Sequence, residues 1–260
     1  MKSLLPLLLS LVVPAAFGHT PYLAPNTFEP LNGDVVTLDA AFAEHFFVPE
    51  AAFDMGQFAV THPDGRVHAP ETLVVLRTRA VLEHRLATDG TYRFSTGRRL
   101  GRVFRMYELD GKRQVAEDPA APLPPGAKPQ AFFQSVTMAE TYVSKGAPNR
   151  AALAPRNDGL ELVAQGHPSE LFAGEAFDLR ALFFGEALAG LKVDVLLASG
   201  LLGATEPLQT LSSSDSGAIS FVPPQKGIYL LRTRHRAPSP EGSLAPEYSH
   251  TYTLVLEVIE

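Results

Sequence analysis

The stretch AAFGHTPY (residues 15–22) contains a histidine, His19, directly behind an apolar run. Cleavage between Gly18 and His19 would make this histidine the first residue of the processed chain. Its α-amino group and its imidazole both lose protons around neutral pH, so the two nitrogens can chelate one divalent ion. A second imidazole would complete a T-shaped set of nitrogens that suits Cu(II) or Ni(II). The alternative is that His19 merely follows the cleavage site and frays in solvent.

Two more histidines are candidate ligands in the first half of the chain. His45 lies in AFAEHFFVPEAAF (residues 41–53), at the end of an expected strand and beside Glu44. A loop at the end of a sandwich could meet the amino-terminal strand, so we predict His45 as the partner of His19. The alternative is a buried, hydrogen-bonded side chain among phenylalanines. His84 shares strand parity with leucines on either side, which favours a core position, and it is the weaker candidate.

His235 and His250 are expected to act as a pair. GIYLLRTRH and SHTYTLVLEV have the pattern of consecutive antiparallel strands joined by a loop at 236–247. Alternation then turns both imidazoles to one face of the sheet, near the mouth of the same hairpin. Tyr229 or Glu247 could be an accessory group of a metal site there. The competing interpretation, which the pattern favours, is a histidine pair that closes the end of the core.

The other residues that could do chemistry give little support to an enzyme. The three remaining histidines (His62, His68 and His167) lie beside prolines or in turns and are expected to face solvent. The chain has no cysteine, which excludes disulfides and thiolate ligands. Gly-x-Ser-x-Gly, His-Glu-x-x-His and Walker-type motifs are absent. We therefore expect a binding protein for a divalent transition metal such as Ni(II) or Cu(II), with no catalytic residues.

The first 18 residues have the features of a cleaved signal peptide. Lys2 provides a positive start, and LLPLLLSLVVPAAF (residues 4–17) is too short and too interrupted by proline to span a bilayer. Small residues, Ala16 and Gly18, precede the expected cleavage site. The sequence therefore predicts export to the periplasm as a soluble chain, with no stable membrane insertion after cleavage.

The charge balance excludes one class of partner. The 260 residues carry 22 basic and 28 acidic side chains, a formal net charge of −6. A nucleic-acid-binding protein usually presents a clustered basic face. The one dense basic stretch, GRRLGRVFR (residues 97–105), alternates with apolar residues and is typical of an exposed strand face. We expect no nucleic-acid partner.

The elements that must position these histidines are short strands. Apolar and β-branched runs alternate with turn residues, and no long stretch keeps a helical period. Three hairpins are predicted, around Asp64-Gly65, Asp89-Gly90 and Asp110-Gly111. The fold class is therefore all-β, with two immunoglobulin-like or β-sandwich domains behind the signal peptide.

The two predicted domains divide the chain near residue 150. After the signal peptide (1–18), the first sandwich covers 19–150 and contains a proline-rich loop at 117–130. The segment KGAPNRAALAPRNDG (145–159) is the predicted boundary. The second sandwich, 151–260, has six or seven strands in about 100 residues, as in immunoglobulin-like domains.

Several motifs together are similar to a known family. They are GHTPYLAP, DAAFAEHFFVPEA, TDGTYRFSTG, KGAPN, the run LELVAQGHPSELFAGEAFDLRALFFGEALAGLKVDV, and SDSGAISFVPPQKGIYLLRTRH. They resemble exported bacterial proteins with a domain of unknown function that are associated with cobalt and nickel uptake. The resemblance covers nearly the whole processed chain. It implies a periplasmic β-sandwich that handles a transition metal, with His19 as its amino-terminal ligand.

Other resemblances keep alternatives open. The amino-terminal histidine followed by GDVVTLDAAFAE also looks like periplasmic copper-resistance sandwiches, so copper remains a candidate cargo. The expected partner is a membrane metal transporter or a TonB-dependent receptor. GEALAGLKVDVLLASG resembles transthyretin-like and carboxypeptidase-regulatory modules, which implies instead a non-metal envelope interaction module with exposed tyrosines (Tyr22, Tyr142 or Tyr248). A copper oxidase built on a histidine brace is a third, weaker interpretation.

Overall fold

The computed structural model describes residues 19–198 and 206–260. The predicted signal peptide and its cleavage site lie outside these residues, apart from His19 itself. The regular secondary structure of the described residues is almost entirely β-strand, with two short 3₁₀ helices, η1 (Ala151–Leu153) and η2 (Pro168–Glu170). Within these ranges, no helix has the length and apolar character needed to cross a membrane. The predicted all-β fold is confirmed.

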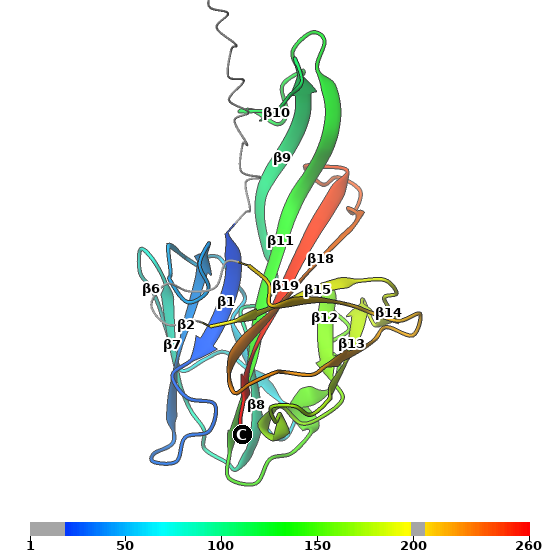
Figure 1. Cartoon of the computed structure of the whole chain (residues 1–260). Helices are drawn as coiled ribbons and strands as arrows, with labels where there is room; N and C mark the ends of the chain where they lie inside the picture. The colour runs from blue at the N-terminus through cyan, green and yellow to red at the C-terminus, as the bar shows by residue number, and fades with distance from the viewer. Residues whose placement is uncertain (1–18, 199–205) are drawn as a thin grey trace, which may run out of the picture.

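The strands form three sheets (Figure 1). The first sheet contains β1 (Thr20–Pro25), β2 (Val35–Ala43), β3 (Ala51–Ala52), β6 (Thr72–Val75) and β7 (Ala80–Arg85). The third sheet contains β12 (Leu160–Ala164), β13 (Phe177–Phe183), β14 (Glu186–Ala187) and β17 (Ala218–Phe221). The central sheet has β4 (Ala59–Thr61), β5 (Val67–His68), β8 (Gly90–Ser95), β9 (Arg99–Leu109), β10 (Lys112–Val115), β11 (Lys128–Lys145), β15 (Lys192–Leu197), β16 (Gln209–Ser212), β18 (Gly227–Pro238) and β19 (Glu247–Val258).

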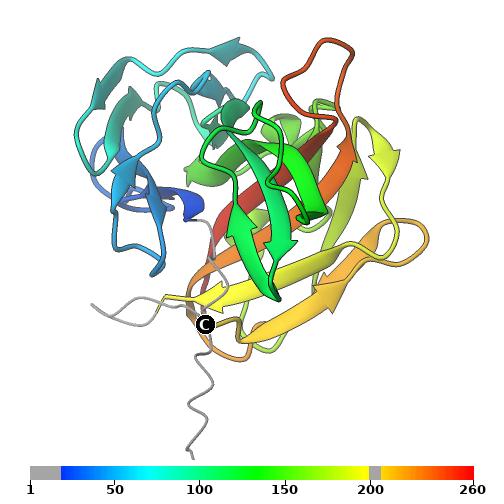
Figure 2. The ribbon, with the colours of Figure 1, turned by 90° about the horizontal axis from the view of Figure 1, so that it is seen from above.

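The central sheet is common to both halves of the chain. Strand β11 from the first half pairs in parallel with β19 from the second half, from Phe133↔Glu247 to Thr141↔Val255. The first and third sheets cover opposite sides of these central strands (Figures 1 and 2). Two packings of one sheet on another are therefore present, and they share a central sheet that continues across residue 150, near the predicted domain boundary.

Alternation along β11 explains how one sheet can serve two cores. Ala139 and Val143 belong to the core beneath the first sheet, whereas Met138 and Tyr142 belong to the core beneath the third sheet. Successive side chains of a strand point to opposite faces, so each core takes every second residue. Because both faces are buried, residues 136–144 are all buried and their polar members need partners within the protein.

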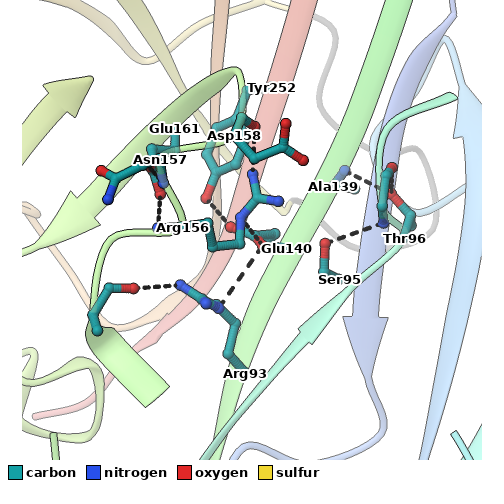
Figure 3. Close-up of polar contacts among 12 residues, drawn as sticks. Arg93, Ser95, Thr96, Ala139, Glu140, Arg156, Asn157, Asp158, Glu161 and Tyr252 are labelled. Atoms are coloured by element: carbon teal, nitrogen blue, oxygen red, sulfur yellow. Dashed lines mark hydrogen bonds and ion pairs between the residues drawn. The ribbon is translucent and has the colours of Figure 1, made fainter. Parts of the chain in front are cut away.

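The polar member at the centre of β11 is Glu140, which is 1% exposed. Its Oε1 lies 3.0 Å from Arg156 Nε and 3.9 Å from Arg93 Nε, and its Oε2 accepts a hydrogen bond of 2.8 Å from Tyr252 (Figure 3). Arg93 also donates to the Ala154 carbonyl at 2.9 Å. These contacts connect β8, β11, β19 and the segment that links the two halves. Burial and the Glu140 charge also raise the pKa of Tyr252 well above its usual value.

Two of the three predicted hairpins are confirmed. β4 and β5 flank Asp64-Gly65, and β9 and β10 flank Asp110-Gly111, where both turn residues have positive φ (52° and 72°) as a type I′ turn requires. The third is wrong, because β7 belongs to the first sheet and β8 to the central sheet. Asp89-Gly90 instead carries the chain between the two sheets, whose facing apolar residues form the first core.

The proline-rich segment is a surface connection shorter than predicted. Residues 116–127 join β10 to β11, but β11 begins at Lys128 and includes Pro129. Together, β9, β10 and the start of β11 form an arm that projects beyond both sandwiches (Figure 1). In the second half, every predicted strand is present, and β16 is added at the edge of the central sheet.

Candidate metal-binding site

His19 immediately precedes β1, whose start is fixed by the neighbouring sheet. Thr20 pairs with Ala43 of β2, and its hydroxyl accepts a hydrogen bond of 3.0 Å from Arg232 of β18. Thr253 of β19 donates to the Pro21 carbonyl at 2.9 Å. Continuing the β1–β2 register by one residue brings His19 beside Glu44. The first described residue is therefore held at the end of the first sheet, although its side chain is exposed.

The loop after β2 folds back over this end of the sheet. Val48 donates to the His45 carbonyl at 2.8 Å, and Phe47 adopts a positive φ of 69° within the turn. Glu50 donates to the Phe42 carbonyl at 3.0 Å before β3 pairs again with β2. The loop thereby returns Glu50 to the place where β2 ended.

Aromatic packing holds the loop against β1. The ring of Tyr22 lies 6.1 Å from that of Phe46 and 5.3 Å from that of Phe47, both edge to face. Phe46 is 5% exposed and belongs to a small core with residues of the first and central sheets. Edge-to-face pairs of this kind are each worth about 0.5–1.5 kcal/mol beyond their buried area. The apolar half of the loop thus anchors its polar half.

The polar half of the loop meets His19. Glu50 Oε2 lies 3.1 Å from His19 Nδ1, and Glu50 Oε1 accepts a hydrogen bond of 2.8 Å from the Glu44 backbone N–H. Ligand atoms of Glu44, His45 and Glu50 all lie within 4.8 Å of one another. Among the described residues, no other group of three or more histidine and acidic side chains is so close. We call His19, Glu44, His45 and Glu50 the amino-terminal site.

The donor set of the amino-terminal site matches a borderline divalent ion. It offers two imidazoles and two carboxylates, and a processed chain would add the α-amino nitrogen of His19. Imidazole suits zinc, copper and nickel, and tetragonal N,O sets are typical of Cu(II) and Ni(II). The nitrogen that faces Glu50 is Nδ1, the ring nitrogen nearer to the residue's own amine. An ion chelated by His19 would therefore lie next to a carboxylate.

His19 and His45, which the sequence predicts as partners, each lie near Glu50, a carboxylate that the sequence analysis missed. Glu50 lies six residues after Glu44, behind Val48-Pro49. The sequence feature that could have indicated Glu50 is the short strand β3 (Ala51–Ala52), which follows it and pairs with β2. Two residues of strand are too short for alternation to reveal.

His84 lies far from the amino-terminal site. It pairs with Val36 on β2, seven residues from Ala43, which corresponds to about 23 Å of strand. His84 is 3% exposed and points into the core between the first and central sheets, as its parity with Leu82 and Leu86 predicts. It cannot share an ion with His19.

His235 and His250 are direct cross-strand partners, as predicted, on β18 and β19. They face the third sheet, where the Phe183 ring lies 4.7 Å from His235 and 5.0 Å from His250. Burial, His235 and Arg98 lower the pKa of His250 to about 4. The pair packs against Phe183 at the end of the second core, with the positive charge of Arg98 nearby.

Other exposure predictions require correction. His167, expected in solvent, is 7% exposed, and its ring bonds Thr91, Ser169 and the Asn149 carbonyl. His62 is half-buried, and only His68 is exposed as expected. Tyr22 and Tyr142 are buried in the cores, so they cannot form a binding patch.

Most of the chain matches one known protein family. A model described as "Domain of unknown function (DUF4198)" matches residues 16–237. The chain belongs to the DUF4198 family. The matched residues include the whole amino-terminal site, His84 and His235, but end before His250. This agrees with the predicted membership of a family defined by a domain of unknown function.

Two other comparisons add no function. A search of curated proteins found no match. Among solved structures, the chain is similar to one described as "D0-D1 domain of Intimin", with 9% identity, 92% of this DUF4198 chain and 97% of that chain covered, and a TM-score of 0.23. A likeness at that score carries no argument about this protein.

Proposed function

We propose that this DUF4198 protein is a periplasmic carrier that binds a divalent transition metal and takes part in its uptake or delivery. Nickel or cobalt is the proposed cargo, with copper as the alternative. The observation that supports the proposal is the approach of Glu50 to His19 Nδ1 beside Glu44 and His45. His19 is distant in the sequence from Glu44, His45 and Glu50, and the fold brings it to them at an exposed end of a sheet, where an ion can enter and leave.

Exposure of the ligands favours transport over catalysis. His19, Glu44, His45 and Glu50 lie at the surface, where cargo can pass to a partner. The proposed recipient is a membrane metal transporter or a TonB-dependent receptor. Release would be helped by acid, because imidazoles and amines bind protons in competition with the metal.

The first test combines the processing site with metal stoichiometry. Protein recovered from the periplasm should begin at His19 by intact mass and bind one Ni(II) per chain at the amino-terminal site in equilibrium dialysis. His45→Gln should weaken binding by roughly tenfold or more, equivalent to about 1.4 kcal/mol. His235→Gln serves as the matched control and should leave binding at this site unchanged. A chain that begins elsewhere, or equal affinity in the His45 variant and the parent protein, would contradict the proposal.

A further inference from the structure

Three histidines outside the amino-terminal site meet at one end of the first core. His62 follows β4, and His68 on β5 pairs with Val60, two residues before His62. Cross-strand partners and residues two apart share a face of the sheet, so His62 and His68 lie on the same side. His84 approaches from β7 of the opposite sheet. Neither sheet alone contains the cluster, which forms where the two sheets pack together.

The three imidazoles make a row with His62 in the middle. The ring centroid of His62 lies 5.0 Å from that of His84 and 4.9 Å from that of His68. Tyr92 of β8 lies behind the row, 5.2 Å from the His62 ring and 6.2 Å from the His84 ring. The row therefore runs from an exposed side chain, through a half-buried one, to a fully buried one.

The buried end of the row contains polar atoms without partners. Both ring nitrogens of His84 and Nε2 of His62 are inaccessible to solvent, and no described residue hydrogen bonds to them. An unsatisfied buried donor or acceptor costs about 1–3 kcal/mol, so such groups are rare in folded proteins. His84 could be replaced by an apolar residue at lower cost if packing were its sole role. The orphaned nitrogens indicate a bound species that satisfies them.

The chemistry of the row favours a metal ion as that species. Nε2 of His62 and both ring nitrogens of His84 are buried without a partner, and a neutral imidazole has one nitrogen lone pair that can bind a metal. With metal–nitrogen bonds of about 2.0–2.1 Å, two imidazoles at a tetrahedral angle place their ring centroids about 5 Å apart. The His62–His84 separation has this value.

We propose that His62 and His84 bind a second transition-metal ion, with His68 as the ligand on the solvent side through which the ion enters. An all-imidazole pair against Tyr92 and Phe94 suits Zn(II), Co(II) or copper and excludes hard ions such as Mg²⁺ and Ca²⁺. His68 is exposed and can turn toward the ion. This site does not depend on the proposed carrier function, because it shares no residue with the amino-terminal site.

The test uses a full-length processed protein in which His19→Ala and Glu50→Gln disable the amino-terminal site. Titration with Co(II), followed by its visible absorption, should show one equivalent bound, and Zn(II) should displace it. In NMR spectra, Zn(II) should shift the ring signals of His62 and His84. His62→Gln, and separately His84→Phe, which fills the core without nitrogen atoms, should each weaken Co(II) binding by roughly tenfold or more. His68→Gln should weaken it by a smaller factor.

The controls separate metal binding from folding. Circular dichroism should show that each variant keeps the β-sheet spectrum, and His62→Gln, which lies at the rim of the core, provides a readout if His84→Phe does not fold. His235→Gln should bind Co(II) as the parent does. If the protein with His19→Ala and Glu50→Gln bound no Co(II), or if adding His62→Gln left Co(II) binding unchanged, the proposal would be overturned. The orphaned nitrogens would then need another partner, such as a buried water molecule. Neither result would affect the amino-terminal site.

Discussion

Burial of His250 makes a quantitative prediction about stability in acid. Its side chain is 4% exposed against Phe183, and its pKa falls from 6.5 to about 4. Because one pKa unit corresponds to about 1.4 kcal/mol, this lowering is worth about 3 kcal/mol. Native proteins are stable by about 5–15 kcal/mol, so the effect is a large fraction of the total.

The sign follows from which state binds the proton first. Between pH 6.5 and pH 4, His250 is protonated in the unfolded chain but neutral in the folded protein. Acid therefore favours unfolding across this window. Above pH 6.5, His250 is neutral in both states, and the free energy of unfolding has its full value with respect to this residue. Burial also lowers the pKa of His62, His84 and His235, so these residues act in the same direction.

The His250→Phe variant isolates one residue from this group. Denaturant unfolding of both proteins at pH 7 and pH 4 should show that the parent loses about 3 kcal/mol more than the variant. Carboxylates that titrate in the same pH range are present in both proteins, so their effect on the free energy of unfolding cancels in the comparison. In addition, the His250 ring signal of the folded protein should titrate in NMR with a midpoint near 4. A midpoint near 6.5, or equal losses in the two proteins, would refute this explanation.

Three further perturbations test other parts of the structure. Glu140→Gln leaves the buried Arg93 and the half-buried Arg156 without their carboxylate and should cost about 3–5 kcal/mol in chemical denaturation. The control Arg85→Ala, at an exposed ion pair, should cost about 1 kcal/mol or less. Gly97→Ala should lower the melting temperature, because φ is +66° and the added Cβ would lie 2.4 Å from the Gln57 carbonyl oxygen. The control is Gly33→Ala, where φ is +87° but the added Cβ has open space, so its melting temperature reports the backbone strain alone. Glu50→Gln keeps the acceptor for the Glu44 N–H but removes a charge, so calorimetry should show weaker Ni(II) binding with an unchanged melting temperature in the metal-free protein.

The sequence predicted the strands better than their partners. Alternation in β2, β7 and β19 is local, and each strand appears where the pattern placed it. The parallel pairing of β11 with β19 joins residues more than 100 positions apart and has no local signal. The shared central sheet depends instead on packing between distant segments, because residues 136–144 are all buried and β11 is covered on both faces.

The candidate sites show the same limit. Parity correctly placed His84 in the core and His235 beside His250, because these are properties of single strands and hairpins. The contact of Glu50 with His19 and the meeting of His62 with His84 are contacts between loops or between sheets. Proximity to proline suggested an exposed His62, but its turn folds over the open end of the first core.

The proposed carrier function depends most directly on a free α-amino nitrogen at His19. The deciding measurement is the Ni(II) dissociation constant of protein that begins at His19, compared with protein that keeps Gly18 and is otherwise identical. Retaining Gly18 turns the chelating amine into an amide while leaving Glu44, His45 and Glu50 in place. We predict affinity that is weaker by roughly tenfold or more, or about 1.4 kcal/mol, in the longer chain. Equal affinity in the two proteins would contradict the amino-terminal chelate and the transport function built on it.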